Sequence, residues 1–151
     1  MVLCTRLSQQ TLSRCTRTKY KHSEYQRCLQ LSTQNVHTLI GADSGSRILS
    51  TYSEFIQLMD DDLVCLTGLT LLADPSCRKD YKHIKISQLT LSLYLMTQCH
   101  MKLHHAVTSL AQTLDYIKVA RRKLSGDYTL DQLLLKLSEQ KILRYVLCDA
   151  V

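Results

Sequence analysis

Three of the 6 histidines stand close together in the chain, at His100, His104 and His105. His100 and His104 are four residues apart, so on a helix they would share one face, where two imidazoles can bind a metal ion. No glutamate lies between them as in the H-E-x-x-H zinc hydrolases, and apart from Cys99 no Cys–carboxylate set stands nearby to complete a tetrahedral site. We therefore expect polar histidines at a helix end and no metal site.

The run Asp60, Asp61 and Asp62 is a second group with chemical potential, because three carboxylates suggest magnesium binding. Carboxylates also suit the positive end of a helix dipole, and we expect a solvated helix start at this place. The chain has 4 glycines, none at the G-x-x-x-x-G-K spacing of a phosphate-binding loop, and no recognisable Ser/His/Asp signature. The sequence thus predicts no cofactor and no enzymatic activity.

The cysteines show none of the C-x2-C or C-x4-C spacings that zinc sites use. Their number is odd, and residues 1–10 lack the apolar core of a secretory signal, so free thiols in a reducing compartment are expected. No apolar run approaches the ~20 residues of a membrane span, and we expect a soluble, intracellular protein. The 7 cysteines are at positions 4, 15, 28, 65, 77, 99 and 148.

The composition favours an all-α domain. Only 4 glycines and 1 proline interrupt 151 residues that are 45% hydrophobic, and leucine dominates the apolar residues. Charge is distributed unevenly, because residues 1–36 hold six Lys or Arg against Glu24 alone. We expect residues 1–40 to form a basic, poorly ordered N-terminal arm. Binding of this arm to nucleic acid or to an anionic surface is the alternative.

The stretch GADSGS at 41–46 separates this arm from a helical domain at 47–151. Apolar residues at three- and four-residue spacings predict a helix over 47–59. The run 63–73 is apolar on nearly every side, which predicts a helix that is buried in the centre of the domain and ended by Pro75. A β-strand is the competing interpretation of this short run.

The longest periodic segment runs from 86 to 124, where apolar residues step by alternating three and four. This stripe is typical of helices that pack side by side. The polar interval 98–105 is the expected loop between two helices. Basic residues occupy the last turns before Gly126, and we expect Gly126 to end this helix in the left-handed conformation. A final helix, or two, is expected over 130–147.

Three segments, taken in order, resemble the C-terminal half of a nuclear-receptor ligand-binding domain. RILSTYSEFIQLMDDDLVCLTGLTLLADPS is similar to the family's central helix pair, ISQLTLSLYLMTQ to the long helix that follows, and KLSGDYTLDQLLLKLSE to the Gly-Asp turn and the short activation helix. The resemblance covers about residues 47–151. It implies an antiparallel helical sandwich, all-α, and a transcriptional regulator located in the nucleus, or in cytoplasm and nucleus.

On the family's activation-helix pattern, Leu133 and Leu134 take the first apolar pair, and Leu137 keeps the next apolar position. Lys136 stands where the family has a glutamate that caps the N-terminal amides of a coactivator LxxLL helix. A lysine cannot do so, because it brings positive charge to the positive end of that helix dipole. The resemblance therefore implies a coregulator-binding domain of constitutive, repressive or heterodimer-dependent type.

The resemblance implies further partners. Part of the long stripe corresponds to the helix through which the family's members dimerise, which implies a homodimer or a heterodimer with another receptor. The alternative is that the residues of this stripe fill the chain's own core. A small lipophilic ligand is implied, with no ligand-binding residues assigned. The family's zinc DNA-binding module has no counterpart here. The dimer-helix residues are Leu103, Val107, Leu110, Leu114 and Ile117.

The stretch LDQLL at 130–134 supports a different function. An LxxLL helix inserts its leucines, at i, i+3 and i+4, into an apolar groove of a partner. A small helical adaptor that presents this motif is therefore the alternative to a receptor-like domain. Such an adaptor must expose Leu130 and Leu134 to solvent when it is free, whereas a core helix buries them.

Overall fold

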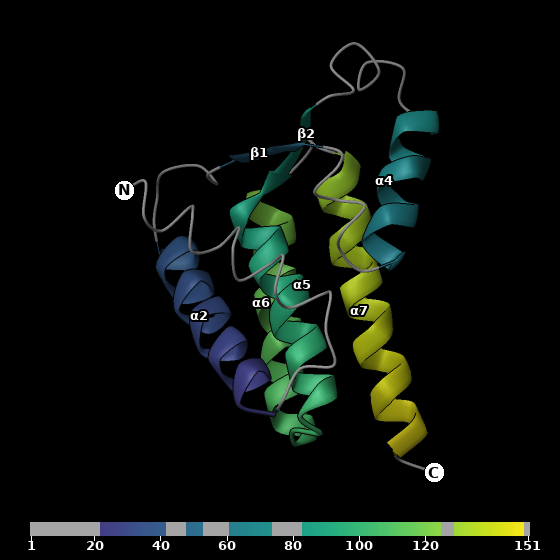
Figure 1. Cartoon of the computed structure of the whole chain (residues 1–151). Helices are drawn as coiled ribbons and strands as arrows, with labels where there is room; N and C mark the ends of the chain where they lie inside the picture. The colour runs from purple at the N-terminus through teal and green to yellow at the C-terminus, as the bar shows by residue number, and fades with distance from the viewer. Residues whose placement is uncertain (1–21, 42–47, 53–60, 74–82, 125–128, 150–151) are drawn as a thin grey trace.

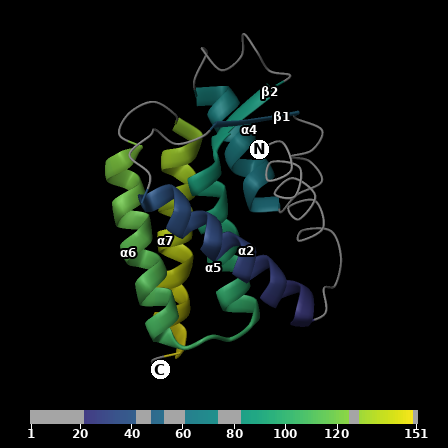
Figure 2. The same cartoon turned by 90° about the vertical axis from the view of Figure 1, so that its left-hand side faces the viewer.

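The computed structural model describes residues 22–41, 48–52, 61–73, 83–124 and 129–149. α5, α6 and α7 run side by side, α2 crosses α5 obliquely, and α4 lies beside α7 (Figure 1, Figure 2). Within the described residues the fold is all-α, as predicted, apart from one two-stranded ribbon. In chain order the elements are α2 (His22–Gly41), β1 (Ile48–Tyr52), α4 (Asp61–Ala73), β2 (His83–Ser87), α5 (Gln88–Lys102), α6 (Val107–Lys123) and α7 (Thr129–Asp149).

α5 is the central helix of the domain. Residues 88–97 are all buried, because α2, α6 and α7 pack around this helix. Ser87 caps its N-terminus, where the Ser87 Oγ accepts a hydrogen bond from the backbone N–H of Thr90 across 3.3 Å. One apolar cluster joins α5 to α4 and α7, and a second joins α5 to α6 and α7. These clusters hold α7 in place along most of its length.

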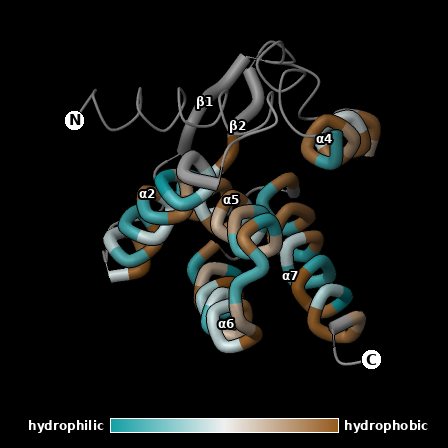
Figure 3. Tube along the Cα trace, turned by 60° about the horizontal axis from the view of Figure 1, so that its bottom comes forward, coloured by the Kyte–Doolittle hydropathy of each residue, from teal (hydrophilic) through white to brown (hydrophobic). Residues whose placement is uncertain are grey.

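α4 begins and ends where the sequence predicts, at Asp61 and Ala73. The prediction that it is the buried central helix was wrong. Leu63 is buried against the core at 1% exposure, but Leu72 on the opposite face is 71% exposed. Figure 3 shows α4 as a largely hydrophobic helix that stands apart from α6. The hydrophobicity of a helix does not by itself show whether other helices surround it. Here α5 is the surrounded helix, although it contains more polar residues than α4.

The helix predicted over 47–59 is wrong where the structure describes it, because Ile48–Tyr52 is the strand β1. β1 pairs antiparallel with β2, Ile48 opposite Ser87 and Tyr52 opposite His83. β2 leads directly into α5, so Ile86, expected at the start of a helical stripe, is a strand residue that enters the core. Residues 53–59 lie outside the described residues.

α2 corrects the expectation of a poorly ordered arm for the part from His22 onward. Its buried face consists of Cys28, Ser32 and Val36, which are four residues apart and are at most 4% exposed. Cys28 and Val36 belong to the two clusters around α5. Because this stripe contains one serine and one cysteine, it gives only a weak helical signal in the sequence. Residues 1–21, with most of the basic charge, lie outside the described residues.

The loop between α5 and α6 is shorter than the predicted interval, because α5 continues through Lys102 and α6 begins at Val107. His104 has a φ of 51°, the left-handed conformation that often ends a helix. Cations occupy the last turn of α6, as predicted, whereas Gly126 lies outside the described residues. The expected final segment is one helix, α7.

Candidate functional site on helix α7

The LDQLL stretch forms the first turns of α7, and its leucines at the first and last positions face the core. Leu130 is 4% exposed and Leu134 is 0% exposed, and both belong to the cluster that α7 shares with α5 and α4. The adaptor hypothesis requires these two side chains at the surface, so the structure contradicts it. Core packing accounts for the leucine-rich pattern, since α7 contacts α4, α5 and α6.

Asp131, inside the same stretch, connects the start of α7 to the start of α5. Its Oδ1 accepts a hydrogen bond from the backbone N–H of Ser87 across 2.9 Å, and the residue is 1% exposed. Burial raises the pKa of this carboxyl, while the Ser87 N–H and the Thr90 hydroxyl oppose the rise. Thr90 Oγ1 and Asp131 Oδ2 fall short of hydrogen-bond geometry, so the Ser87 contact is the one that fixes the carboxyl.

Sequence reasoning missed Asp131. The available signal was an acidic residue in the first turn of a predicted helix, which ordinarily indicates a solvated side chain that favours the dipole of its own helix. Here the carboxylate instead lies against the N-terminus of α5, a helix 44 positions earlier in the chain. That contact depends on tertiary structure and leaves no local pattern.

The remaining predicted coregulator residues lie at the surface of α7 or near it. Lys136 is exposed, whereas Leu133 and Leu137 are half-buried. Leu137 packs against the cluster that contains α4 residues. The three positions are neighbours on a helix surface because they are three and four residues apart. α7 therefore presents one cation beside two leucines that keep part of their surface accessible.

The C-terminal half of α7 exposes two more leucines that sequence reasoning did not select. Leu143 is 47% exposed and Leu147 is 67% exposed, and the two are one turn apart. Arg144, next to Leu143, is also exposed. The neighbouring face of this half is closed, because Ile142 is 0% exposed and Val146 packs against the core. The sequence shows Leu143 and Leu147 as part of a leucine-rich helix, but it does not show which sides of that helix are covered by other helices.

The five predicted dimer-helix residues are not brought to one surface. Leu110 and Ile117 are at most 1% exposed and belong to the cluster between α5, α6 and α7. Leu103 is 8% exposed, and Leu114 packs against the same cluster. Val107 alone among the five is exposed, at 49%. This burial favours the interpretation in which the stripe fills the chain's own core.

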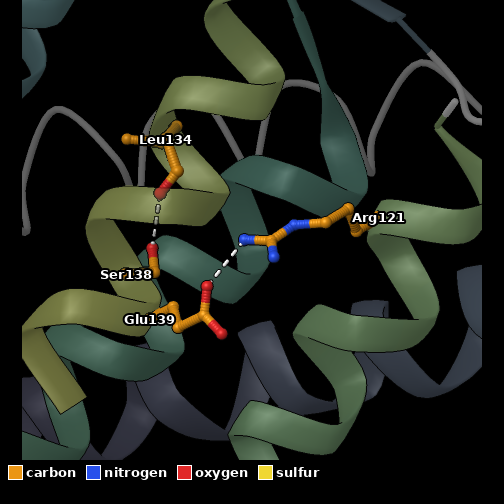
Figure 4. A network of polar contacts seen from close by, with 4 residues as sticks. All are labelled: Arg121, Leu134, Ser138 and Glu139. Atoms are coloured by element: carbon orange, nitrogen blue, oxygen red, sulfur yellow. Dashed lines mark hydrogen bonds and ion pairs between the residues drawn. The ribbon is translucent and has the colours of Figure 1, made fainter. Parts of the chain in front are cut away.

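Polar contacts fix α7 against its neighbours. Lys141 forms an ion pair with Asp62 at the start of α4, and its Nζ lies 5.5 Å from the ring centroid of Tyr94 on α5. On the other side, Arg121 Nη2 of α6 donates to Glu139 Oε2 across 2.8 Å (Figure 4). These contacts set the rotation of α7 about its own axis and so determine which of its residues face solvent.

The histidine cluster lies at the loop between α5 and α6. His100 Nδ1 and His105 Nδ1 are 3.0 Å apart and share a hydrogen bond. His104 points elsewhere, its Nδ1 lying 3.2 Å from the hydroxyl oxygen of Tyr145 on α7. Burial, together with the neighbouring His105, lowers the pKa of His100 to about 4, so this ring is neutral near pH 7.

The buried Nε2 of His100 has no hydrogen-bond partner, and this indicates which ring nitrogen of His100 carries the proton. With the proton on Nδ1, His100 donates to His105 and leaves only a bare lone pair at Nε2, so we assign this tautomer. A metal ion at Nδ1 would instead place an unpaired N–H in the core, unlike metal-bound histidines. Over the described ranges, no three His, Cys, Asp or Glu side chains are grouped as metal ligands.

Three further observations are not tied to a single site. None of the helices in the described part is both long enough and apolar enough to cross a membrane. None of the described cysteines, Cys28, Cys65, Cys99 and Cys148, forms a disulfide bond. A scan against protein-family models, a search of curated proteins and a search of solved structures found no match to this chain.

Proposed function

We propose that this chain is a nuclear-receptor-like transcriptional regulator domain, which acts in the nucleus through protein partners and uses α7 as an atypical activation helix. The proposal begins from the order of three sequence segments. Of the segment that resembles the central helix pair, Asp61–Ala73 is the helix α4, whereas Ile48–Tyr52 is the strand β1. The long segment after it forms α5, and the stretch after Gly126 and Asp127 forms α7. The receptor-like sandwich and the coregulator role of α7 belong to this proposal.

The observation that carries the proposal is the surroundings of Lys136. Its side chain is exposed on α7 beside the half-buried Leu133 and Leu137. A partner helix needs such a combination, because apolar side chains supply affinity and a charged group fixes orientation. The anchoring of α7 by Asp131 and Lys141 supports the proposal, since a binding surface on a fixed helix loses less conformational entropy when a partner docks.

The charge of Lys136 defines the kind of coregulator that fits. A lysine repels the positive N-terminal end of a docked helix and attracts its C-terminal carbonyls or its acidic side chains. Standard coactivator binding, with glutamate at this position, is thereby disfavoured. The domain fits a repressive or heterodimer-dependent regulator better than a ligand-activated one.

The resemblance also implies a small lipophilic ligand. Native mass spectrometry of the intact chain would show a bound ligand as added mass.

A tethered reporter assay tests this function. The full chain, fused to a heterologous DNA-binding domain, is expected to change transcription of a reporter gene, and Lys136→Glu is expected to change that output several-fold. Lys102→Glu is the matched control, because Lys102 is an exposed cation at the end of α5, away from Leu133 and Leu137. Equal output from the wild-type fusion and the DNA-binding domain alone would contradict the proposal.

A further inference from the structure

Two pairs of exposed leucines lie on adjacent helices. Leu69 and Leu72 of α4 are 57% and 71% exposed, and Leu143 and Leu147 of α7 are 47% and 67% exposed. Each pair is three or four residues apart, so each forms a short stripe on one helix face. α4 and α7 lie beside each other at one side of the molecule (Figure 1, Figure 3). Single exposed leucines are ordinary, but two stripes on neighbouring helices indicate a binding surface.

The exposed charges described on the two helices are opposite. α4 contains no Lys or Arg, and Asp61 is exposed in its first turn. On α7, the cation Arg144 is exposed next to Leu143. The same pairing already occurs inside the molecule, where Asp62 of α4 binds Lys141 of α7. The charged side chains described as exposed are thus an anion on α4, Asp61, and cations on α7, Lys136 and Arg144, so the surface is complementary to a second copy of itself.

Gly68 is consistent with a helix docked on the outer face of α4. It lies in the interior of the helix, is exposed, and a Cβ atom added there would meet nothing within 4 Å. Internal packing therefore does not require a glycine, although glycine costs about 1 kcal/mol relative to alanine inside a helix. A residue without a side chain next to Leu69 and Leu72 allows another helix to approach closely.

We propose that this chain forms a twofold homodimer in which the outer face of α4 in one copy packs on Leu143 and Leu147 of α7 in the other. Twofold symmetry makes this contact twice, α4 on α7 and α7 on α4. One contact between two short helices is small for a stable interface, whose standard size is about 1,600 Å², and twofold symmetry doubles the area that the contact buries. Asp61 of each copy pairs with Arg144 of its partner. This dimer does not use the buried stripe of α6.

Sedimentation velocity of the full chain tests the dimer, over concentrations up to about 0.1 mM, where a dimer of micromolar Kd is fully formed. The wild type is expected to shift from monomer to dimer. Leu72→Glu or Leu147→Glu is expected to weaken dimerisation at least tenfold, because each places a charge in the apolar contact. Lys118→Glu, an exposed change on α6, is the control and leaves the dimer intact. Circular dichroism confirms that each variant folds.

A charge exchange tests the pairing itself. Asp61→Lys and Arg144→Glu are each expected to weaken the dimer, and the double variant is expected to restore it, because the pair is then reversed rather than broken. A chain that stays monomeric throughout the concentration range would overturn the proposal and leave the surface to a different protein. A dimer that both leucine variants leave intact would overturn it as well, because its interface then lies elsewhere. Neither result bears on the reporter test of Lys136.

Discussion

Asp131 in the first turn of α7 accepts a hydrogen bond from the backbone N–H of Ser87 across 2.9 Å, which connects the last helix of the chain to the N-terminus of the central helix. Ser87 is itself the N-cap of α5, so the carboxylate adds a second acceptor at the end where helix amides lack partners. Because both residues are at most 1% exposed, solvent does not replace this contact when it is lost.

Two substitutions at Asp131 should distinguish the contribution of its hydrogen bond to stability from the contribution of its charge. Asp131→Ala leaves the buried Ser87 N–H without an acceptor, and we expect the free energy of unfolding to fall by about 1–3 kcal/mol. Asp131→Asn keeps an acceptor oxygen, and its amide N–H2 can donate to the unpaired Thr90 Oγ1. We therefore expect Asp131→Asn to be at least as stable as the wild type at pH 7, as measured by urea denaturation.

The sign of the Asp131 pKa shift predicts how this difference depends on pH. Because burial raises the pKa of the folded carboxyl, its contribution to stability is present below the unfolded value of 3.8 and is lost as pH rises through the folded value. The advantage of Asp131→Asn over the wild type should therefore shrink as pH falls. An advantage that grows in acid would show that the folded carboxyl is instead stabilised in its charged form.

His100 should make the domain sensitive to mild acid. The pKa of His100 falls from 6.5 to about 4 on folding, so between these values the unfolded chain binds a proton that the folded chain does not. Each pKa unit corresponds to about 1.4 kcal/mol, and the wild type should lose up to about 3 kcal/mol of unfolding free energy across this window. His100→Leu should not show this loss, as measured by urea denaturation at pH 7 and pH 4.5.

His104→Gln serves as the control for the His100 measurement, because His104 lies only four residues after His100, in the loop that follows α5, and is exposed. Its pH dependence should follow that of the wild type. Equal acid sensitivity in the wild type and in His100→Leu would show that other groups cause the loss and that the buried ring is not responsible.

Two leucines of α7 should differ sharply when they are shortened. Leu134→Ala removes a side chain that is 0% exposed, and we expect a loss of about 2–5 kcal/mol in the free energy of unfolding. Leu147→Ala, at a position that is 67% exposed, should change the same quantity by less than about 0.5 kcal/mol. Thermal or urea unfolding measures both, at a concentration where the chain is monomeric. Similar losses for the two variants would contradict the burial of the LDQLL stretch.

The parts of the fold that local sequence determines were predictable. Asp61 and Asp62 mark the start of α4, and the basic residues 121–123 mark the last turn of α6, because helix ends follow the dipole and the chain's own polar residues. The continuous leucine pattern after Leu130 likewise predicted the final helix. These signals lie within the elements that they define.

The parts that depend on distant contacts were not predictable from one sequence. Ile48–Tyr52 shows helical spacing of apolar residues, but it pairs with His83–Ser87 and is a strand. The same limit applies to the candidate site. Leu130, Leu133 and Leu143 are the same residue type on one helix, yet they are buried, half-buried and exposed, because α4, α5 and α6 cover different sides of α7.

Titration of a fluorescent LxxLL peptide against the wild type and Lys136→Glu, followed by anisotropy, tests most directly whether α7 acts as an activation helix. Glutamate at this exposed position would cap the N-terminal amides of the peptide helix, whereas the lysine repels them. We expect Lys136→Glu to bind the peptide at least tenfold more tightly than the wild type, and Lys102→Glu to bind it no better. No gain for Lys136→Glu would contradict the assignment of a coregulator surface to Leu133, Lys136 and Leu137.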